Sequence, residues 1–260
     1  MKTTTLLFAA MLLFSCKNNQ QSEQPKNTDL VQQNLKGPVQ RTVDTPYKAD
    51  STGNAGAMDS CCAETQELND SGYVTKYYTR NDSGVTKTEQ TLLHYPNGAV
   101  KDISIMNDGK LSNHIVPTID ENGNYNGGLS YDSTNKQDGY YTDMKQNKFG
   151  EITSGKLYKM DSTLKYQFLN NFDKNGRYLS GRTDSAGKAI YTSTATLDGN
   201  GNPVKVITMS MVKDSTKYDT TMYRYDKYDE QGNWIQRITL TASGKPNKII
   251  KREITYYKKE

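Results

Sequence analysis

Apolar and polar residues along this chain follow the pattern of short β-strands separated by tight turns. Residues 73–78 alternate, with Tyr73, Thr75 and Tyr77 on one face of a predicted strand and their neighbours on the other. A period of two is the pattern of a half-buried strand. No segment keeps a helical stripe, so we expect little helix after the first fifteen residues. Similar β-forming runs recur at 103–105, 189–194, 204–209, 234–240 and 249–257.

Glycines preceded by Asp or Asn mark the turns between these runs. Asp and Asn side chains bond back to the local backbone, and glycine adopts positive φ without steric cost. The main series is Gly72, Gly98, Gly123, Gly150, Gly176, Gly201 and Gly232, with steps of 25 to 27 residues and a last step of 31. An offset series comprises Gly84, Gly109, Gly139, Gly187 and Gly244. The repeating unit is therefore one hairpin with two turns.

Repeated hairpins predict an all-β fold, in which each unit buries its face only against its neighbours. We expect an antiparallel hairpin-repeat meander over residues 35–260, forming an elongated twisted sheet or a partly closed barrel. Small residues in 48–66 predict a mobile loop there. The chain has 19 Tyr but only 5 Phe and 1 Trp, which favours half-buried sheet faces over a thick apolar core.

The N-terminus carries an export signal. Lys2 precedes an apolar run at 6–14, which is too short to cross a bilayer and is typical of a signal peptide over residues 1–15. The sequence Leu13-Phe14-Ser15-Cys16 resembles the lipobox of bacterial lipoproteins. The resemblance implies cleavage before Cys16 and acylation of that cysteine, with several chains for stable anchoring. The alternative is ordinary secretion with Cys16 as a free thiol.

Residues 16–34 are polar and rich in Asn and Gln, which predicts a flexible tether between the lipidated cysteine and the folded domain. Surface-exported lipoproteins of Bacteroidetes resemble one another in an acidic cluster directly after the lipidated cysteine. Here the first acidic residue is Glu23, well downstream. We therefore expect an outer-membrane lipoprotein, with the periplasmic face slightly favoured over the cell surface.

The turn sequences resemble a known family. Residues 223–234, with Tyr225-Asp226 and Gly232-Asn233, are similar to the YD-repeat (RHS-like) hairpins of many Bacteroidetes lipoproteins, as are residues 172–178 and 94–98. The resemblance covers most of 35–257 but lacks a regular Arg-Tyr step in each unit. It implies a β-hairpin fold and an envelope location, and it implies no reaction.

Several residue groups carry candidate chemistry without a complete motif. Adjacent Cys61 and Cys62 permit a strained disulfide, a bond between molecules, a soft-metal site or an incidental pair in a loop. The turns 120–124, 198–202 and 229–233 place oxygens as calcium loops do, but no acidic residue stands at the twelfth position.

His94 and His114 are the only histidines, and neither lies in a catalytic motif. We therefore expect no metal, no cofactor and no catalytic residues.

The aromatic residues are the better candidates for ligand contact. Rigid amphipathic rings suit glycans or protein surfaces, although the same rings can instead form the core between hairpins. The candidates for a ligand face are Tyr77, Tyr140, Tyr223, Tyr225 and Trp234.

Function follows from these patterns only at the level of class. The net charge of +4 is scattered, so we expect no nucleic-acid partner. The leading hypothesis is a non-enzymatic envelope lipoprotein that presents a binding or structural surface to an unknown protein or glycan, besides the membrane itself. The alternatives are a glycan-binding or glycan-processing accessory, and an anchored hydrolase with its site in 48–66.

Overall fold

The computed structural model describes residues 28–50, 52–59, 62–212 and 215–258, so Cys16 and the predicted signal peptide lie outside the described residues. Within those ranges, no helix is long and apolar enough to cross a membrane. The elements are α1 (Asp29–Gln32), β1 (Val39–Ala49), β2 (Ala55–Met58), β3 (Ala63–Leu68), β4 (Val74–Arg80), β5 (Thr86–His94), β6 (Val100–Asn107), β7 (Lys110–Ile119), β8 (Tyr125–Tyr131), β9 (Gln137–Gln146), β10 (Ile152–Lys159), β11 (Leu164–Phe172), β12 (Tyr178–Ser185), β13 (Lys188–Leu197), β14 (Pro203–Val212), β15 (Ser215–Tyr228), β16 (Trp234–Leu240) and β17 (Pro246–Tyr256).

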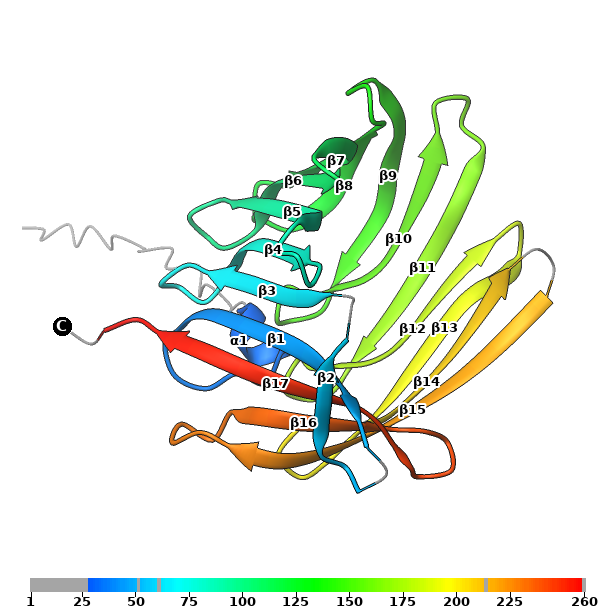
Figure 1. Cartoon of the computed structure of the whole chain (residues 1–260). Coiled ribbons are helices and arrows are strands. Elements are labelled where there is room, and N and C mark those ends of the chain that lie inside the picture. The colour runs from blue at the N-terminus through cyan, green and yellow to red at the C-terminus, as the bar shows by residue number, and fades with distance from the viewer. Residues whose placement is uncertain (1–27, 51, 60–61, 213–214, 259–260) are drawn as a thin grey trace, which may run out of the picture.

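The strands form one closed antiparallel barrel (Figure 1). From β3 to β17 each strand pairs with the next, and β1 closes the ring by pairing with both β3 and β17. The ring has sixteen strands, and β2 is an additional strand that pairs with the C-terminal end of β1. The expected all-β hairpin meander is confirmed, and its closure is complete.

The two series of turns lie at opposite ends of the barrel. The main glycine series connects β3 to β4, β5 to β6 and so on, and its glycines have φ between 75° and 89°. The offset series forms the other end, with one correction. Gly139 lies inside β9, and the turn before it is 132–136, where Asn135 takes the left-handed position at φ 60°. Asn fills it because its short polar side chain tolerates that geometry.

The inner face of the wall is identified by the residues that pack beneath the N-terminal segment. Leu92 and Ile254 contact a buried cluster formed by Leu35, Val39, Leu68 and Val74. Side chains alternate between the two faces along a strand. Arg252, two residues before Ile254, therefore points inward, and Glu89, three residues before Leu92, points outward. The apolar core is thin, as the tyrosine-rich composition predicts, and this cluster lies at one end of the barrel.

The segment 48–66 differs from the expected mobile loop. It holds the end of β1, all of β2 and the start of β3. The loop before β2 crosses the outer face of the wall, where a Cβ added at Gly53 would lie 3.6 Å from Cδ1 of Ile238. Ile238 and its cross-strand partner Ile249 are each only 1% exposed. Small residues are therefore used here to cover an outward-facing apolar pair.

Candidate functional site

Residues 28–38, named here the cap, cross one mouth of the barrel (Figure 1). The Leu30 amide donates to the Gly72 carbonyl at 3.3 Å, and Nε2 of Gln32 donates to Oε2 of Glu151 at 2.6 Å. These partners lie in the β3–β4 and β9–β10 turns, far apart around the ring. The predicted tether over 16–34 therefore differs from the structure in its last part, because residues 28–34 are docked on the barrel.

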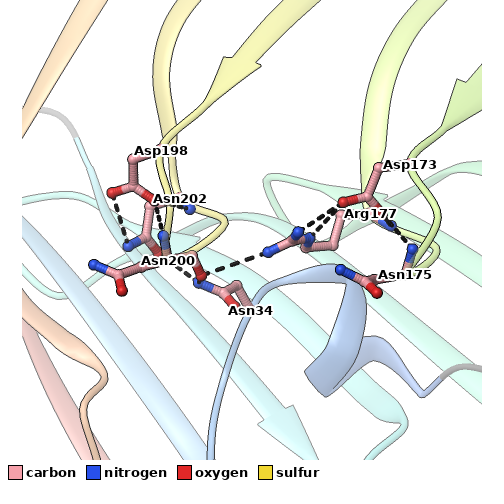
Figure 2. Close-up of polar contacts among 7 residues, drawn as sticks. All are labelled: Asn34, Asp173, Asn175, Arg177, Asp198, Asn200 and Asn202. Carbon is pink, nitrogen blue, oxygen red and sulfur yellow. Dashed lines mark hydrogen bonds and ion pairs between the residues drawn. The ribbon is translucent and has the colours of Figure 1, made fainter.

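The cap also reaches the turns on the far side of the mouth (Figure 2). Nδ2 of Asn34 donates to the Asn200 carbonyl at 2.9 Å and to Oδ1 of Asn202 at 2.8 Å. Arg177 from the adjoining turn donates to the same carbonyl at 3.5 Å, and its Nη2 lies 2.7 Å from Oδ2 of Asp173. The Asn-rich turns thus act as the docking surface for the cap.

The acidic turns that resemble calcium loops use their carboxylates on their own backbone. Oδ1 of Asp198 accepts the amides of Asn200 and Asn202 at 2.9 and 2.8 Å. Asp120 and Asp229 accept the amides two and four residues ahead in the same way. In the part of the chain that the structure describes, no three His, Cys, Asp or Glu residues are grouped to hold a metal ion.

Asn233 fastens the cap at its other end. Its Oδ1 accepts the Lys36 amide at 2.7 Å, and its Nδ2 donates to the Lys36 carbonyl at 2.9 Å and to the Tyr256 hydroxyl at 2.7 Å. Asn233 is 2% exposed. Sequence reasoning missed this role, although the Asn directly after the turn glycine was visible.

An aromatic and charged ladder lines the inner wall over β1, β16 and β17. Arg252 donates two hydrogen bonds to the Asp44 carboxylate, from Nε to Oδ1 at 2.6 Å and from Nη2 to Oδ2 at 2.7 Å. The Arg252 guanidinium lies 3.6 Å from the Trp234 ring centroid, and that of Arg237 lies 4.9 Å from it. Trp234 is 6% exposed, so this ring is packed between side chains.

Tyr223 and Tyr225 extend the ladder along β15. Arg237 lies 4.7 Å from the Tyr223 ring centroid, and the Tyr225 and Trp234 centroids are 5.8 Å apart. The Tyr225 hydroxyl donates to the Pro203 carbonyl at 2.8 Å. Burial raises the pKa of Tyr225 to about 12. These two rings are partly buried on the inner wall.

Tyr77 and Tyr140 lie on opposite faces of the wall. Tyr77 is paired with Gln90, which shares the inward face with Leu92, and burial together with nearby Glu64 raises its pKa to about 12. Tyr140 points outward and stacks on Tyr158, with ring centroids 5.6 Å apart. The structure therefore brings four of the predicted aromatics to the inner wall and separates Tyr140 from them.

Two adjoining cavities open inside the barrel. They lie on a part of the wall several strands away from the ladder. The larger, of about 470 Å³, is lined by apolar and aromatic side chains of β6 to β11, including Ile103, Ile115, Tyr141 and Phe168. The smaller, of about 290 Å³, lies beneath α1. Residues lining both cavities are Val100, Tyr125 and Ile152.

The histidines lie on opposite faces, as their strand positions require. His94 lines the smaller cavity, with Nε2 2.8 Å from the Val74 carbonyl and Nδ1 3.1 Å from the Gly98 carbonyl. His114 points outward, with Nε2 2.8 Å from Oδ2 of Asp102. That hydrogen bond raises the pKa of His114.

The cysteines are divided between described and undescribed parts of the chain. Cys62 is disulfide-bonded, whereas Cys16 and Cys61 lie outside the described residues. Among the alternatives for Cys62, the structure therefore supports a disulfide.

Comparison with known proteins supports the fold. No protein-family model matches the sequence, and no curated protein matches it. A porin-like protein from Bacteroides uniformis is similar in structure, with 12% identity, a TM-score of 0.52, and coverage of 85% of this chain and 99% of that one. A porin-like protein from Bacteroides vulgatus has 12% identity, a TM-score of 0.35, and coverage of 84% and 98%. The chain shares the β-barrel fold of the first of these proteins.

Proposed function

We propose that this chain is a non-enzymatic lipoprotein of the bacterial cell envelope, whose barrel binds a small ligand in its interior. The observation that carries the proposal is the pair of adjoining cavities inside a closed barrel, one of them directly beneath the cap. Concave, mostly apolar sites with a few polar groups are the usual form of small-molecule sites. The lipobox-like sequence at Cys16 supports attachment to the outer membrane.

The charges on the outer face support a barrel held beside the bilayer rather than within it. Outward-facing Lys76 pairs with Glu89 at 3.0 Å, and Lys156 pairs with Asp143 at 2.8 Å, both on the strands themselves. A barrel wall that faces lipid needs an apolar band, and charged residues on it are destabilising. We therefore place the barrel in water, with the lipid at Cys16 as its link to the membrane.

A glycan-binding accessory is the second candidate, because Tyr77, Tyr223 and Tyr225 lie on the inner wall beside charged side chains. Stacking on a sugar needs a free aromatic face, however. Trp234 has Arg237 and Arg252 over its ring and is almost fully buried. This candidate is therefore weaker than a ligand in the apolar cavity.

Two measurements test the proposal. Labelled palmitate should enter the wild-type protein and not the Cys16→Ala variant, and the variant should leave the membrane fraction. Native mass spectrometry of the protein released from envelopes should detect a small bound molecule, which Ile115→Trp should displace by filling the larger cavity. Palmitate-free protein, or a barrel that carries no molecule and accepts none from an envelope extract, contradicts the proposal.

A further inference from the structure

We infer that the ligand is a small amphipathic amine, whose apolar body lies in the larger cavity and whose cationic head lies beneath the cap. This inference rests on the proposed function and names the ligand class of that same site. It follows from the shape and lining of two spaces that adjoin each other.

The larger cavity has a smooth apolar wall because a glycine lies behind its side chains. A Cβ at Gly155 would lie 2.6 Å from Sδ of Met144 and 2.7 Å from Cζ of Phe168, both of which line the cavity. The absent side chain lets the thioether and the ring lie against the strand, which leaves room in the interior. At about 470 Å³ the space accepts an alkyl or ring system.

Hydrogen-bonding groups in the larger cavity are few. The hydroxyls of Tyr141 and Tyr166 bond to each other at 3.2 Å, and Asn170 donates to the Ile152 carbonyl at 3.2 Å. Each of these groups therefore already has one partner within the wall. A strongly polar ligand would therefore lose its hydration here without gaining equivalent partners.

The smaller cavity differs in that carboxyl groups are added to its apolar lining. Its lining includes the carboxyl groups of Asp29 and Glu151 and the imidazole of His94, and it includes no Lys or Arg among the described residues. Oδ2 of Asp29 accepts the Val74 amide at 2.6 Å. Burial raises the pKa of Asp29, whereas the hydrogen bond from Val74 and the nearby His94 act in the opposite direction. A cationic head offsets that desolvation, whereas a carboxylate head would be repelled.

The adjoining walls set the orientation of the ligand. Tyr125 and Ile152 line both spaces, so a molecule that fills the larger cavity can extend its head past them toward α1. The cap supplies Asp29 itself, which means that a bound head contacts the segment that closes the mouth. Charge complementarity therefore selects an amine over an alcohol or an acid of the same length.

The test uses isothermal titration of the Cys16→Ser full chain with octylamine, octanol and octanoate. We expect the amine to bind about ten-fold tighter than the alcohol and the carboxylate to bind weakest, a difference of about 1.4 kcal/mol for each ten-fold step. Asp29→Asn keeps an acceptor for Val74 and should bring the amine and the alcohol to equal affinity. Asp161→Asn is the matched control, since Asp161 also bonds a backbone amide but in an exposed turn at the opposite end.

Cavity-filling variants separate the inference from the proposed function. Ile115→Trp and Thr183→Leu enter the larger cavity from different strands, and each folded variant should lose all three probes. Equal binding of amine, alcohol and acid overturns the amine while leaving an interior site. No saturable binding by the wild-type chain, or binding unchanged in both filled variants, overturns the interior site itself.

Discussion

Replacing Asn233 with Ala tests whether the cap is held by a few buried hydrogen bonds. The change removes three bonds, two to the Lys36 backbone and one to the Tyr256 hydroxyl, at 2.7 to 2.9 Å. It leaves the Lys36 amide and carbonyl without these partners. At about 1 kcal/mol for each bond, the free energy of unfolding should fall by about 3 kcal/mol. For a chain of this size, Tm should fall by roughly 6–12 °C.

The matched control is Asn124→Ala, at the same position after a turn glycine. Asn124 is exposed, and its backbone amide, which the substitution keeps, bonds to Asp120. Its replacement should change the free energy of unfolding by about 0.5 kcal/mol or less. Urea denaturation measures both variants, and hydrogen exchange at the Lys36 amide shows whether the loss is local to the cap. Equal losses in the two variants, or an unchanged exchange rate at Lys36 in Asn233→Ala, would refute the reasoning.

Three further predictions concern a turn, a surface histidine and the inner ladder. Gly201→Ala should cost up to about 1 kcal/mol more than Gly244→Ala in urea denaturation: both have φ of 80° or more, but only at Gly201 would the new Cβ displace the Arg177 guanidinium from its ion pair with Asp173. The stabilisation from His114, whose pKa is raised, should be complete below its ordinary pKa and lost as the pH rises through the raised value. Tm of the wild type should therefore fall relative to His114→Gln between about pH 6 and 8, and parallel curves would contradict this. Arg252→Met leaves a carboxylate unpaired at a site where both side chains are at most 15% exposed, and should cost about 3–5 kcal/mol; a loss under about 1 kcal/mol would show that the pair is not stabilising.

The repeating turns were predictable because their chemistry is local. The residue type at a positive φ depends only on the four or five residues of its own turn. Gly72 and Gly201 therefore identify their turns without knowledge of the fold. Gly139 shows the limit of that reasoning. Asn135, four residues earlier, takes the positive φ that the turn requires. The spacing of glycines alone could not show that Gly139 lies in a strand.

The closure of the barrel and the direction of the side chains were not predictable in the same way. β1 and β17 pair Thr42 with Ile254, and no local pattern connects positions so far apart in sequence. A bulge between Val74 and Lys76 turns the first inward and the second outward, although they are two residues apart. Simple alternation therefore could not assign the aromatics to the two faces.

Residues 28–34 of the cap were predicted as part of a tether because their sequence is polar. Asn34 and Lys36 dock through hydrogen bonds to turns from distant parts of the chain, and Leu35 adds a single buried apolar side chain to this docking. Composition measures the capacity to bury apolar surface, and it is insensitive to docking of this kind.

The pairing of β1 with β17 sets the order in which the molecule can be completed. The strand that is synthesised early waits for one that follows it by about two hundred residues. Until then β1 and the growing sheet present open edges, which are prone to pairing with other chains. Contacts at such long sequence separation also slow folding. Under the export that we propose, this topology would keep the ring open until its final strand has left the translocation channel.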